Sequence, residues 1–131
     1  MHASTGCTVD ELLAAARAGL TRIPPGALAR EQADGALVVD IRPVEQRNRD
    51  GELPGAVVID RNVLEWRLAP SSLDRVVDLD RERKVIVVCN EGYQSSLAAA
   101  TLRRLAVEGA TDLIGGYQGL LAMWDEVIPE G

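Results

Sequence analysis

Cys89 opens a short polar stretch, CNEGYQSS, in which a thiol could act as a nucleophile. The stretch follows an apolar run at residues 85–88 and precedes an alanine-rich segment that begins near Ser95. A cysteine at the end of an apolar run is more often an inert buried thiol than a reagent. The segment between Cys89 and Ser95 is too polar to fill a hydrophobic core, however, and this favours a functional thiol.

A loop that curls from Cys89 into the start of a helix would direct several backbone N–H groups at the sulfur and add the positive end of the helix dipole. Such a nest of N–H groups stabilises an anion, and the thiolate is the nucleophilic form of cysteine. Gly92 would supply the positive φ or the close backbone approach that the curl needs. We therefore expect Cys89 to be the reactive residue and the amides of residues 90–95 to form its anion-binding loop.

The elements that would position this loop can be read from the hydrophobic pattern. Short, mostly β-branched runs at residues 36–39, 56–59 and 85–88 are typical of strands covered on both faces, and therefore of a parallel sheet. A fourth strand is expected at residues 110–114. Helices are predicted at residues 9–19, 25–33, 95–107 and 117–127. The sequence thus predicts an α/β fold, a small parallel sheet flanked by helices on both faces, whose ligand site lies beyond the carboxyl ends of the strands.

Length and charge restrict the partners. A chain of 131 residues is long enough for one domain with its own core. Its formal net charge is -6 and Lys84 is its only lysine, so a nucleic-acid partner is not expected. No segment is long and apolar enough to span a bilayer, and the N-terminus lacks the pattern of a signal peptide. With two cysteines far apart, no disulfide framework is indicated, and we expect a cytoplasmic location.

Several kinds of site are excluded by the residues available. His2 is the only histidine, so a Ser-His-Asp triad or a Cys-His pair has no central member. Cys7, Cys89 and His2 are too dispersed to form a zinc site, and we expect no metal. Three glycines near the C-terminus match neither a dinucleotide-binding nor a phosphate-binding loop, and they are interpreted as turn residues without a cofactor. These are Gly115, Gly116 and Gly119.

Three motifs together indicate a family. The run CNEGYQSSLAAATL from Cys89 resembles the active-site loop and helix, C-x-x-G-x-[R/T/S]-S-x-x-A-A-x-x-L, of rhodanese-like sulfurtransferases. Asp40-Ile-Arg42, followed by GELPGA at residues 51–56, is similar to the D-x-R and G-H-I-P-G-A segments of that family. The glycine pair before Trp124 is similar to its closing element. Because the three lie in the family's order, the resemblance is more specific than any one motif.

The resemblance implies a rhodanese-like three-layer sandwich at residues 22–131, preceded by a helical extension at residues 1–21. It also implies a sulfurtransferase in which Cys89 carries a sulfane sulfur as a persulfide between a donor and a nucleophilic acceptor. The donor would be a small sulfur compound, such as thiosulfate, mercaptopyruvate or polysulfide, or a protein persulfide, and no cofactor is required. The loop that binds substrate and persulfide would comprise Asn90, Glu91, Gly92, Tyr93, Gln94 and Ser95.

Other residues receive roles with alternatives. Asp40 and Arg42 are expected to form a structural ion pair at a strand end. Arg47 and Arg67 are possible substrate contacts at the pocket rim, although the charge pattern around Arg47 favours a solvated helix face. Two serines, Ser95 and Ser96, could donate hydrogen bonds to the bound sulfur or could cap the helix. Cys7 is a bystander or a resolving thiol.

The chain departs from the family pattern at three positions. Gln94 stands where Arg or Thr is common, and Glu52 replaces the His of the G-H-I-P-G-A segment. Glu91 places a carboxylate inside the loop, where it would repel dianionic thiosulfate by roughly 1 kcal/mol. Thiosulfate is therefore expected to be a poor donor, and a protein persulfide a better one.

Two other functions remain as alternatives. Phosphatases of related architecture use a longer C-x5-R loop, whose arginine clamps the phosphate. Here the sixth residue after Cys89 is Ser95, and residues 90–95 contain no arginine. The other alternative is a non-catalytic rhodanese-like module with a binding or regulatory role. Such modules usually lack the cysteine, so the intact Cys89 loop favours catalysis.

Overall fold

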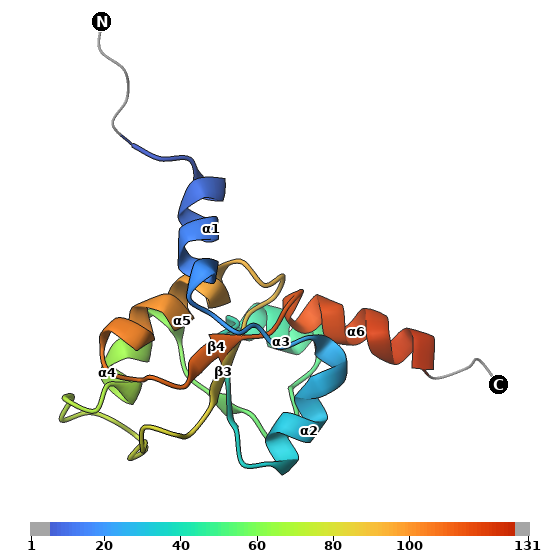
Figure 1. Cartoon of the computed structure of the whole chain (residues 1–131). Coiled ribbons are helices and arrows are strands. Elements are labelled where there is room, and N and C mark those ends of the chain that lie inside the picture. The colour runs from blue at the N-terminus through green and yellow to red at the C-terminus, as the bar shows by residue number, and fades with distance from the viewer. Residues whose placement is uncertain (1–5, 128–131) are drawn as a thin grey trace, which may run out of the picture.

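A parallel sheet with the strand order β2-β1-β3-β4 forms the centre of the computed structural model, which describes residues 6–127 (Figure 1). The strands are β1 (Leu37–Asp40), β2 (Val57–Val58), β3 (Val85–Val88) and β4 (Ala110–Asp112). The α-helices are α1 (Val9–Ala18), α2 (Leu28–Ala33), α3 (Val44–Asp50), α4 (Leu64–Leu68), α5 (Gln94–Arg104) and α6 (Gly116–Val127). Two short 3-10 helices are η1 (Pro25–Ala27) and η2 (Arg61–Val63). The predicted α/β class is confirmed.

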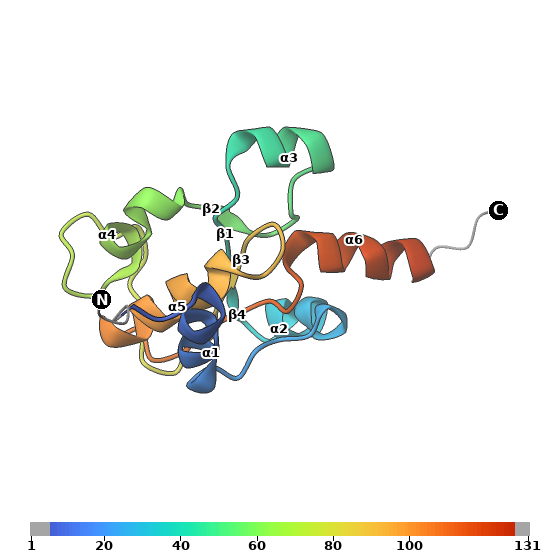
Figure 2. The same cartoon turned by 90° about the horizontal axis from the view of Figure 1, so that it is seen from above.

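Helices cover both faces of this sheet, as predicted. Val39 and Val87 point toward the core shared with α4 and α5, whereas Val38 and Ile86 point toward the core shared with α2 and α6. Successive side chains of a strand point to opposite faces, so a run of β-branched residues can serve both cores. Figure 2 shows α4 and α5 on one side of the strands and α2 and α6 on the other.

The register of the central strands determines where the site lies. β1 and β3 pair along their whole length, and Asp40 at the end of β1 lies beside Val88 at the end of β3. Cys89 is the next residue after Val88. Because the strands are parallel, the segments that follow β1 and β3 leave the sheet at the same edge.

The prediction for β2 was wrong in one respect. Residues 56–59 were expected to form a strand buried on both faces, but β2 comprises only Val57 and Val58, and both side chains are exposed. β2 is an edge strand that pairs with β1 alone. Apolar β-branched residues favour an edge strand as much as a central one, so composition did not distinguish the two.

The first helix matches its predicted position at residues 9–19 closely. A capping box starts α1: the Thr8 hydroxyl accepts from the Glu11 N–H at 3.0 Å, and the Glu11 carboxylate accepts from the Thr8 N–H at 2.9 Å. The backbone hydrogen bond from Thr8 holds the pKa of Glu11 below its usual range. α1 packs beside α5, away from the sheet itself (Figure 1). His2, the only histidine, lies outside the described residues.

Within residues 6–127, no helix has both the length and the apolar character needed to cross a membrane.

Candidate functional site

The Cys89 side chain lies in a loop directly after β3, at the carboxyl end of the sheet. The residue is 7% exposed, and two backbone N–H groups converge on its Sγ. The Gly92 N–H donates at 3.1 Å and the Ser95 N–H at 3.3 Å. Ser95 lies in the first turn of α5, so the helix presents its N-terminal, electropositive end to the sulfur. The arrangement can stabilise negative charge on Sγ or on an atom bonded to it.

Glycine backbone makes this loop conformation possible. Gly92 has a φ of +89°, and a Cβ at this position would lie 2.9 Å from the backbone nitrogen of Gly115. Gly116 lies even closer to the start of the loop, because a Cβ there would collide with the carbonyl oxygen of Cys89. The predicted turn glycines therefore have a second role: they let the turn before α6 pack directly against the Cys89 loop.

The start of α6 also holds the loop by hydrogen bonds. The Tyr117 N–H donates to the carbonyl oxygen of Cys89 at 2.8 Å, and the Gln118 N–H donates to that of Asn90 at 3.0 Å. The carbonyl groups of Cys89 and Asn90 are thus directed at N–H groups of α6, whereas the N–H groups of Gly92 and Ser95 face the sulfur.

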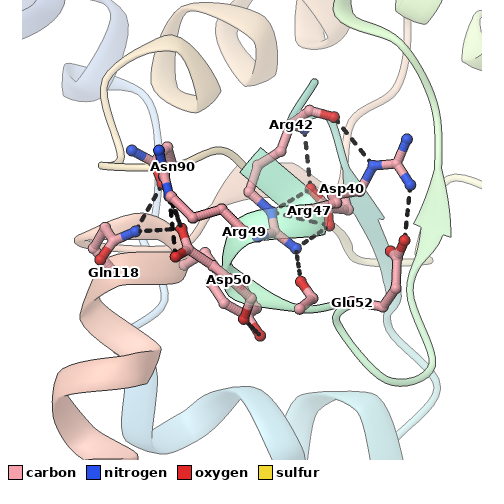
Figure 3. Close-up of polar contacts among 10 residues, drawn as sticks. Asp40, Arg42, Arg47, Arg49, Asp50, Glu52, Asn90 and Gln118 are labelled. Atoms are coloured by element: carbon pink, nitrogen blue, oxygen red, sulfur yellow. Dashed lines mark hydrogen bonds and ion pairs between the residues drawn. The ribbon is translucent and has the colours of Figure 1, made fainter. Parts of the chain in front are cut away.

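A carboxylate at the end of α3 extends this support. The Gln118 side-chain amide donates to Asp50 Oδ2 and to Asn90 Oδ1, both at 2.9 Å (Figure 3). Arg49 pairs with the same Asp50 oxygen at 2.7 Å. This hydrogen bond from Arg49 holds the pKa of Asp50 below its usual range, and the Gln118 bond acts in the same direction. Asn90 is therefore a residue that anchors the loop through its side chain.

Asp40 and Arg42 form an ion pair with fully buried side chains, with 2.8 Å between Arg42 Nη2 and Asp40 Oδ2. Arg42 also donates to the carbonyl oxygen of Gly51 at 2.8 Å, and its guanidinium lies 3.7 Å from the ring centroid of Tyr117. The pair thus connects the end of β1 to the end of α3 and the start of α6. Its hydrogen bonds are made within the protein, which is the pattern of a structural pair.

The two arginines expected at the pocket rim have other surroundings. Arg47 pairs with Glu52 at 2.9 Å, so the residue that replaces the family His neutralises it. The Arg67 side chain makes no hydrogen bond or ion pair within residues 6–127, and it lies beside Val58 and Val76. Neither donates to the Cys89 loop.

Arg61 is an arginine that contacts a side chain of the loop. Its Nε donates to Gln94 Oε1 at 3.2 Å, and its Nη1 also pairs with Glu65 at 2.9 Å. Sequence reasoning missed this residue, because a side chain in η2 meets the loop only through the tertiary fold.

The Ser95 N–H contacts Sγ, as predicted for the loop, whereas the hydroxyl groups of Ser95 and Ser96 have a partner that was not predicted. The hydroxyl groups of Ser95 and Ser96 both donate to Asp112 Oδ2, at 2.8 and 2.7 Å. The residue at the N-cap position of α5 is Tyr93, and it makes no capping hydrogen bond with its side chain. Asp112 was not considered in the sequence. The one available signal was a carboxylate in the middle of the strand expected at residues 110–114.

The outer side of the loop carries negative charge. Glu91 is exposed and has no ion pair within the described part of the chain. Tyr93, two residues further on, is also exposed, at 59%. Cys7 is exposed and, like Cys89, has a free thiol. Nowhere in residues 6–127 do three or more His, Cys, Asp or Glu side chains gather as a metal site would require.

Comparison with known proteins identifies relatives of this chain. The rhodanese-like domain model matches residues 24–123. The chain is 27% identical over 109 residues to the thiosulfate sulfurtransferase GlpE of Pseudomonas savastanoi pv. phaseolicola (strain 1448A / Race 6), a match that covers 83% of this chain and 91% of that protein.

Solved structures of other proteins also superpose on this chain. Human single-domain sulfurtransferase TSTD1 superposes with a TM-score of 0.63 and 26% identity, over 77% of this chain and 95% of that one. A protein of unknown function from Rhodopseudomonas palustris CGA009, described as a possible tyrosine phosphatase, superposes with a TM-score of 0.81 and 24% identity, over 100% and 99%. At that identity the second likeness concerns the fold alone.

Proposed function

The chain belongs to the rhodanese-like domain family, and we propose that it is a sulfurtransferase that carries a sulfane sulfur on Cys89 as a persulfide. The observation that carries this proposal is the pair of N–H groups, from Gly92 and Ser95, that lie 3.1 and 3.3 Å from Sγ. A thiol that served only for packing would not need two backbone donors. The likeness to a thiosulfate sulfurtransferase supports the same reaction class.

In the first half-reaction, the Cys89 thiolate attacks the outer sulfur of the donor. A new S–S bond forms to Cys89, and the bond between that sulfur and the rest of the donor breaks. With thiosulfate, sulfite leaves with the bonding electron pair. With a protein persulfide, a thiolate leaves. The product is a persulfide anion, and the N–H groups of the loop together with the start of α5 stabilise its charge.

In the second half-reaction, a nucleophilic acceptor attacks the terminal sulfur of the persulfide. The S–S bond to Cys89 breaks, its electron pair returns to Sγ, and the thiolate is restored. The same two N–H groups of Gly92 and Ser95 then stabilise the leaving thiolate. No proton has to be delivered by a general acid, which is consistent with a loop that has no histidine among residues 89–96.

The charges around the loop disfavour donors that carry two negative charges. Glu91 is an exposed carboxylate in the loop, and Glu52 neutralises Arg47. Arg61 contacts the loop only through Gln94, and its guanidinium also forms an ion pair with Glu65. Repulsion from a loop carboxylate is greater for a dianion than for a monoanion. We therefore propose a protein persulfide, which carries a single negative charge, as the preferred donor, and a protein thiol as the natural acceptor.

Neither alternative function is favoured by a specific contact. Residues 90–95 contain no arginine, so a phosphoryl group would lack the bidentate clamp that a phosphatase of this architecture needs. A non-catalytic module would have no use for N–H groups directed at Sγ. The fold likeness to a possible tyrosine phosphatase does not outweigh these observations.

Sulfur transfer to cyanide, measured as thiocyanate, tests the proposal. Wild-type protein should produce thiocyanate from at least one of thiosulfate, mercaptopyruvate, polysulfide or a persulfidated protein. Once the uncatalysed reaction of each donor with cyanide is subtracted, Cys89→Ser should be inactive with all four. Cys7→Ser, the matched control on the exposed thiol, should retain full activity. Equal rates from wild type and Cys89→Ser would refute the proposal, and so would no thiocyanate from any donor.

A further inference from the structure

A cluster of three charged residues lies behind the Cys89 loop: Arg17, Arg22 and Asp112 bond to the loop and to the first turn of α5. At its centre is Asp112, the last residue of β4, which is fully buried. Its carboxylate accepts hydrogen bonds from the hydroxyl groups of Ser95 and Ser96, at 2.8 and 2.7 Å. Arg22 pairs with both of its oxygens, at 2.9 and 3.1 Å. A buried carboxylate with this many donors is held in one position.

Two arginines of the N-terminal segment also hold the loop directly. The carbonyl oxygen of Gly92 accepts from Arg17 Nη2 at 2.8 Å and from Arg22 Nη2 at 3.2 Å. Arg17 Nε donates in addition to the Ser96 hydroxyl at 3.0 Å. Arg17 therefore spans the loop and the first turn of α5, which are the two segments that meet at the sulfur.

The cluster holds the same two residues that contact Sγ. Gly92 donates its N–H to the sulfur, while its carbonyl oxygen accepts from two guanidinium groups. Ser95 donates its N–H to the sulfur, while its hydroxyl donates to Asp112. The groups behind the loop are thus two cations and one anion, so a net positive charge lies behind the N–H groups that face an anionic sulfur.

We infer that Arg17, Arg22 and Asp112 are positioning residues of the sulfur-transfer reaction, and that helix α1 is part of the active site through Arg17. This inference rests on the proposed function. Arg17 and Arg22 contact a loop carbonyl, a serine hydroxyl and a carboxylate, and none of the three residues contacts Sγ. They act by holding the N–H groups of Gly92 and Ser95 in the orientation that stabilises negative charge on the sulfur atoms during both half-reactions. Preorganised donors of this kind lower the barrier, so their loss reduces kcat more than it raises KM.

The local sequence explains how Arg17 comes to be there. The capping box at Thr8 sets the start of α1, and Arg17 falls in the last turn of this helix, where a cation is favoured by the helix dipole. α1 packs along α5, so its last turn lies beside the first turn of α5 and the loop before it (Figures 1 and 2). The chain then continues to Arg22 and joins the sheet edge at Ile23, which bridges to Leu113 next to Asp112.

The test compares Arg17→Ala with Arg30→Ala. Arg30 is exposed on α2 and its side chain has no hydrogen bond or ion pair within residues 6–127, so this variant changes the net charge equally. Backbone amide exchange at Gly92 and Ser95 is measured by NMR on the reduced protein without donor. kcat and KM are measured with the donor that wild type uses best.

Arg17→Ala should exchange the two amides about tenfold faster or more, and should lower kcat about tenfold with KM within about twofold, since a charge-assisted hydrogen bond is lost. Arg17→Lys keeps the charge but loses the planar guanidinium, so its amide exchange rates and its kcat should lie between those of wild type and Arg17→Ala. Arg30→Ala should match wild type. Unchanged amide exchange and kcat in Arg17→Ala would overturn the inference.

A rise in KM alone would also overturn it, because that pattern belongs to a residue that binds the donor. If Arg17→Ala unfolds, the amide exchange rates and the kinetic constants of Arg17→Lys test the inference instead. The exchange measurement needs no turnover, so it judges the role of Arg17 even if wild type transfers no sulfur. In that case the proposed function is wrong, and the amide exchange rates alone decide whether Arg17 holds the Cys89 loop in place.

Discussion

Substituting Gly92 by alanine should impair the loop in two separable ways. The first is backbone strain, because Gly92 has a φ of +89°. An L-residue in the left-handed region costs about 1–2 kcal/mol. The second is a steric overlap, because the new Cβ would lie 2.9 Å from the Gly115 nitrogen. Gly115 cannot easily withdraw, since hydrogen bonds hold its neighbours: Ile114 N–H to Ile23, and Gly116 N–H to Leu113.

Two other glycines serve as matched controls. Gly19 has a φ of -96° and no atom near its would-be Cβ, so Gly19→Ala should be neutral or stabilise by up to about 1 kcal/mol. Gly35 has a φ of +101° with the same open space. Gly35→Ala should therefore lower the free energy of unfolding by about 1–2 kcal/mol through strain alone. Gly92→Ala should lower it by more than Gly35→Ala does, and the difference measures the overlap with Gly115.

Urea denaturation and sulfur transfer to cyanide together check this reasoning. Gly92→Ala should lose at least about tenfold in kcat, because the displaced loop no longer aims its N–H groups at Sγ. Gly35→Ala, though destabilised, should transfer sulfur at the wild-type rate under native conditions. The reasoning is refuted if Gly92→Ala is as stable and as active as Gly35→Ala.

Two further predictions concern charges near the loop. Glu91→Gln should raise kcat/KM for thiosulfate about two- to fivefold by removing a like charge, with a smaller rise for monoanionic mercaptopyruvate. Equal rises for the two donors would contradict this explanation. Asp50 has a lowered pKa in the folded protein, so its contribution to stability is complete above its unfolded pKa and is lost as the pH falls through its folded pKa. Urea midpoints of Asp50→Asn should thus decline less than those of wild type on acidification below about pH 4, and parallel declines would disprove the contribution.

Local sequence patterns were sufficient to predict the central strands and the loop between β3 and α5. The β-branched runs that became β1 and β3 pair with each other and are buried on both faces, which is the environment such runs favour. Gly92 and the polar residues around Cys89 predicted a curled loop at the carboxyl end of the sheet, and two N–H groups do contact the sulfur. These features depend on residues close together in the chain.

The parts that could not be predicted depend on contacts between distant segments. Arg17 meets Gly92 across 75 positions, and Arg61 meets Gln94 across 33. Nothing near Arg17 in the sequence distinguishes it from any other arginine in the last turn of a surface helix. The burial of Asp112 follows from the pairing of β4 with β3, which brings the end of β4 behind the loop. Such positions become recognisable only when the order of the strands is known.

The mass of the peptide that contains Cys89 tests the central claim most directly. Reduced protein is incubated separately with thiosulfate, mercaptopyruvate, polysulfide and a persulfidated protein, in parallel with Cys89→Ser. We predict the gain of one sulfur atom on this peptide, removable by cyanide and absent from the variant, with the protein persulfide as the best donor. A Cys89 peptide that gains no sulfur from any donor would contradict the account and leave a rhodanese-like module that only binds a partner.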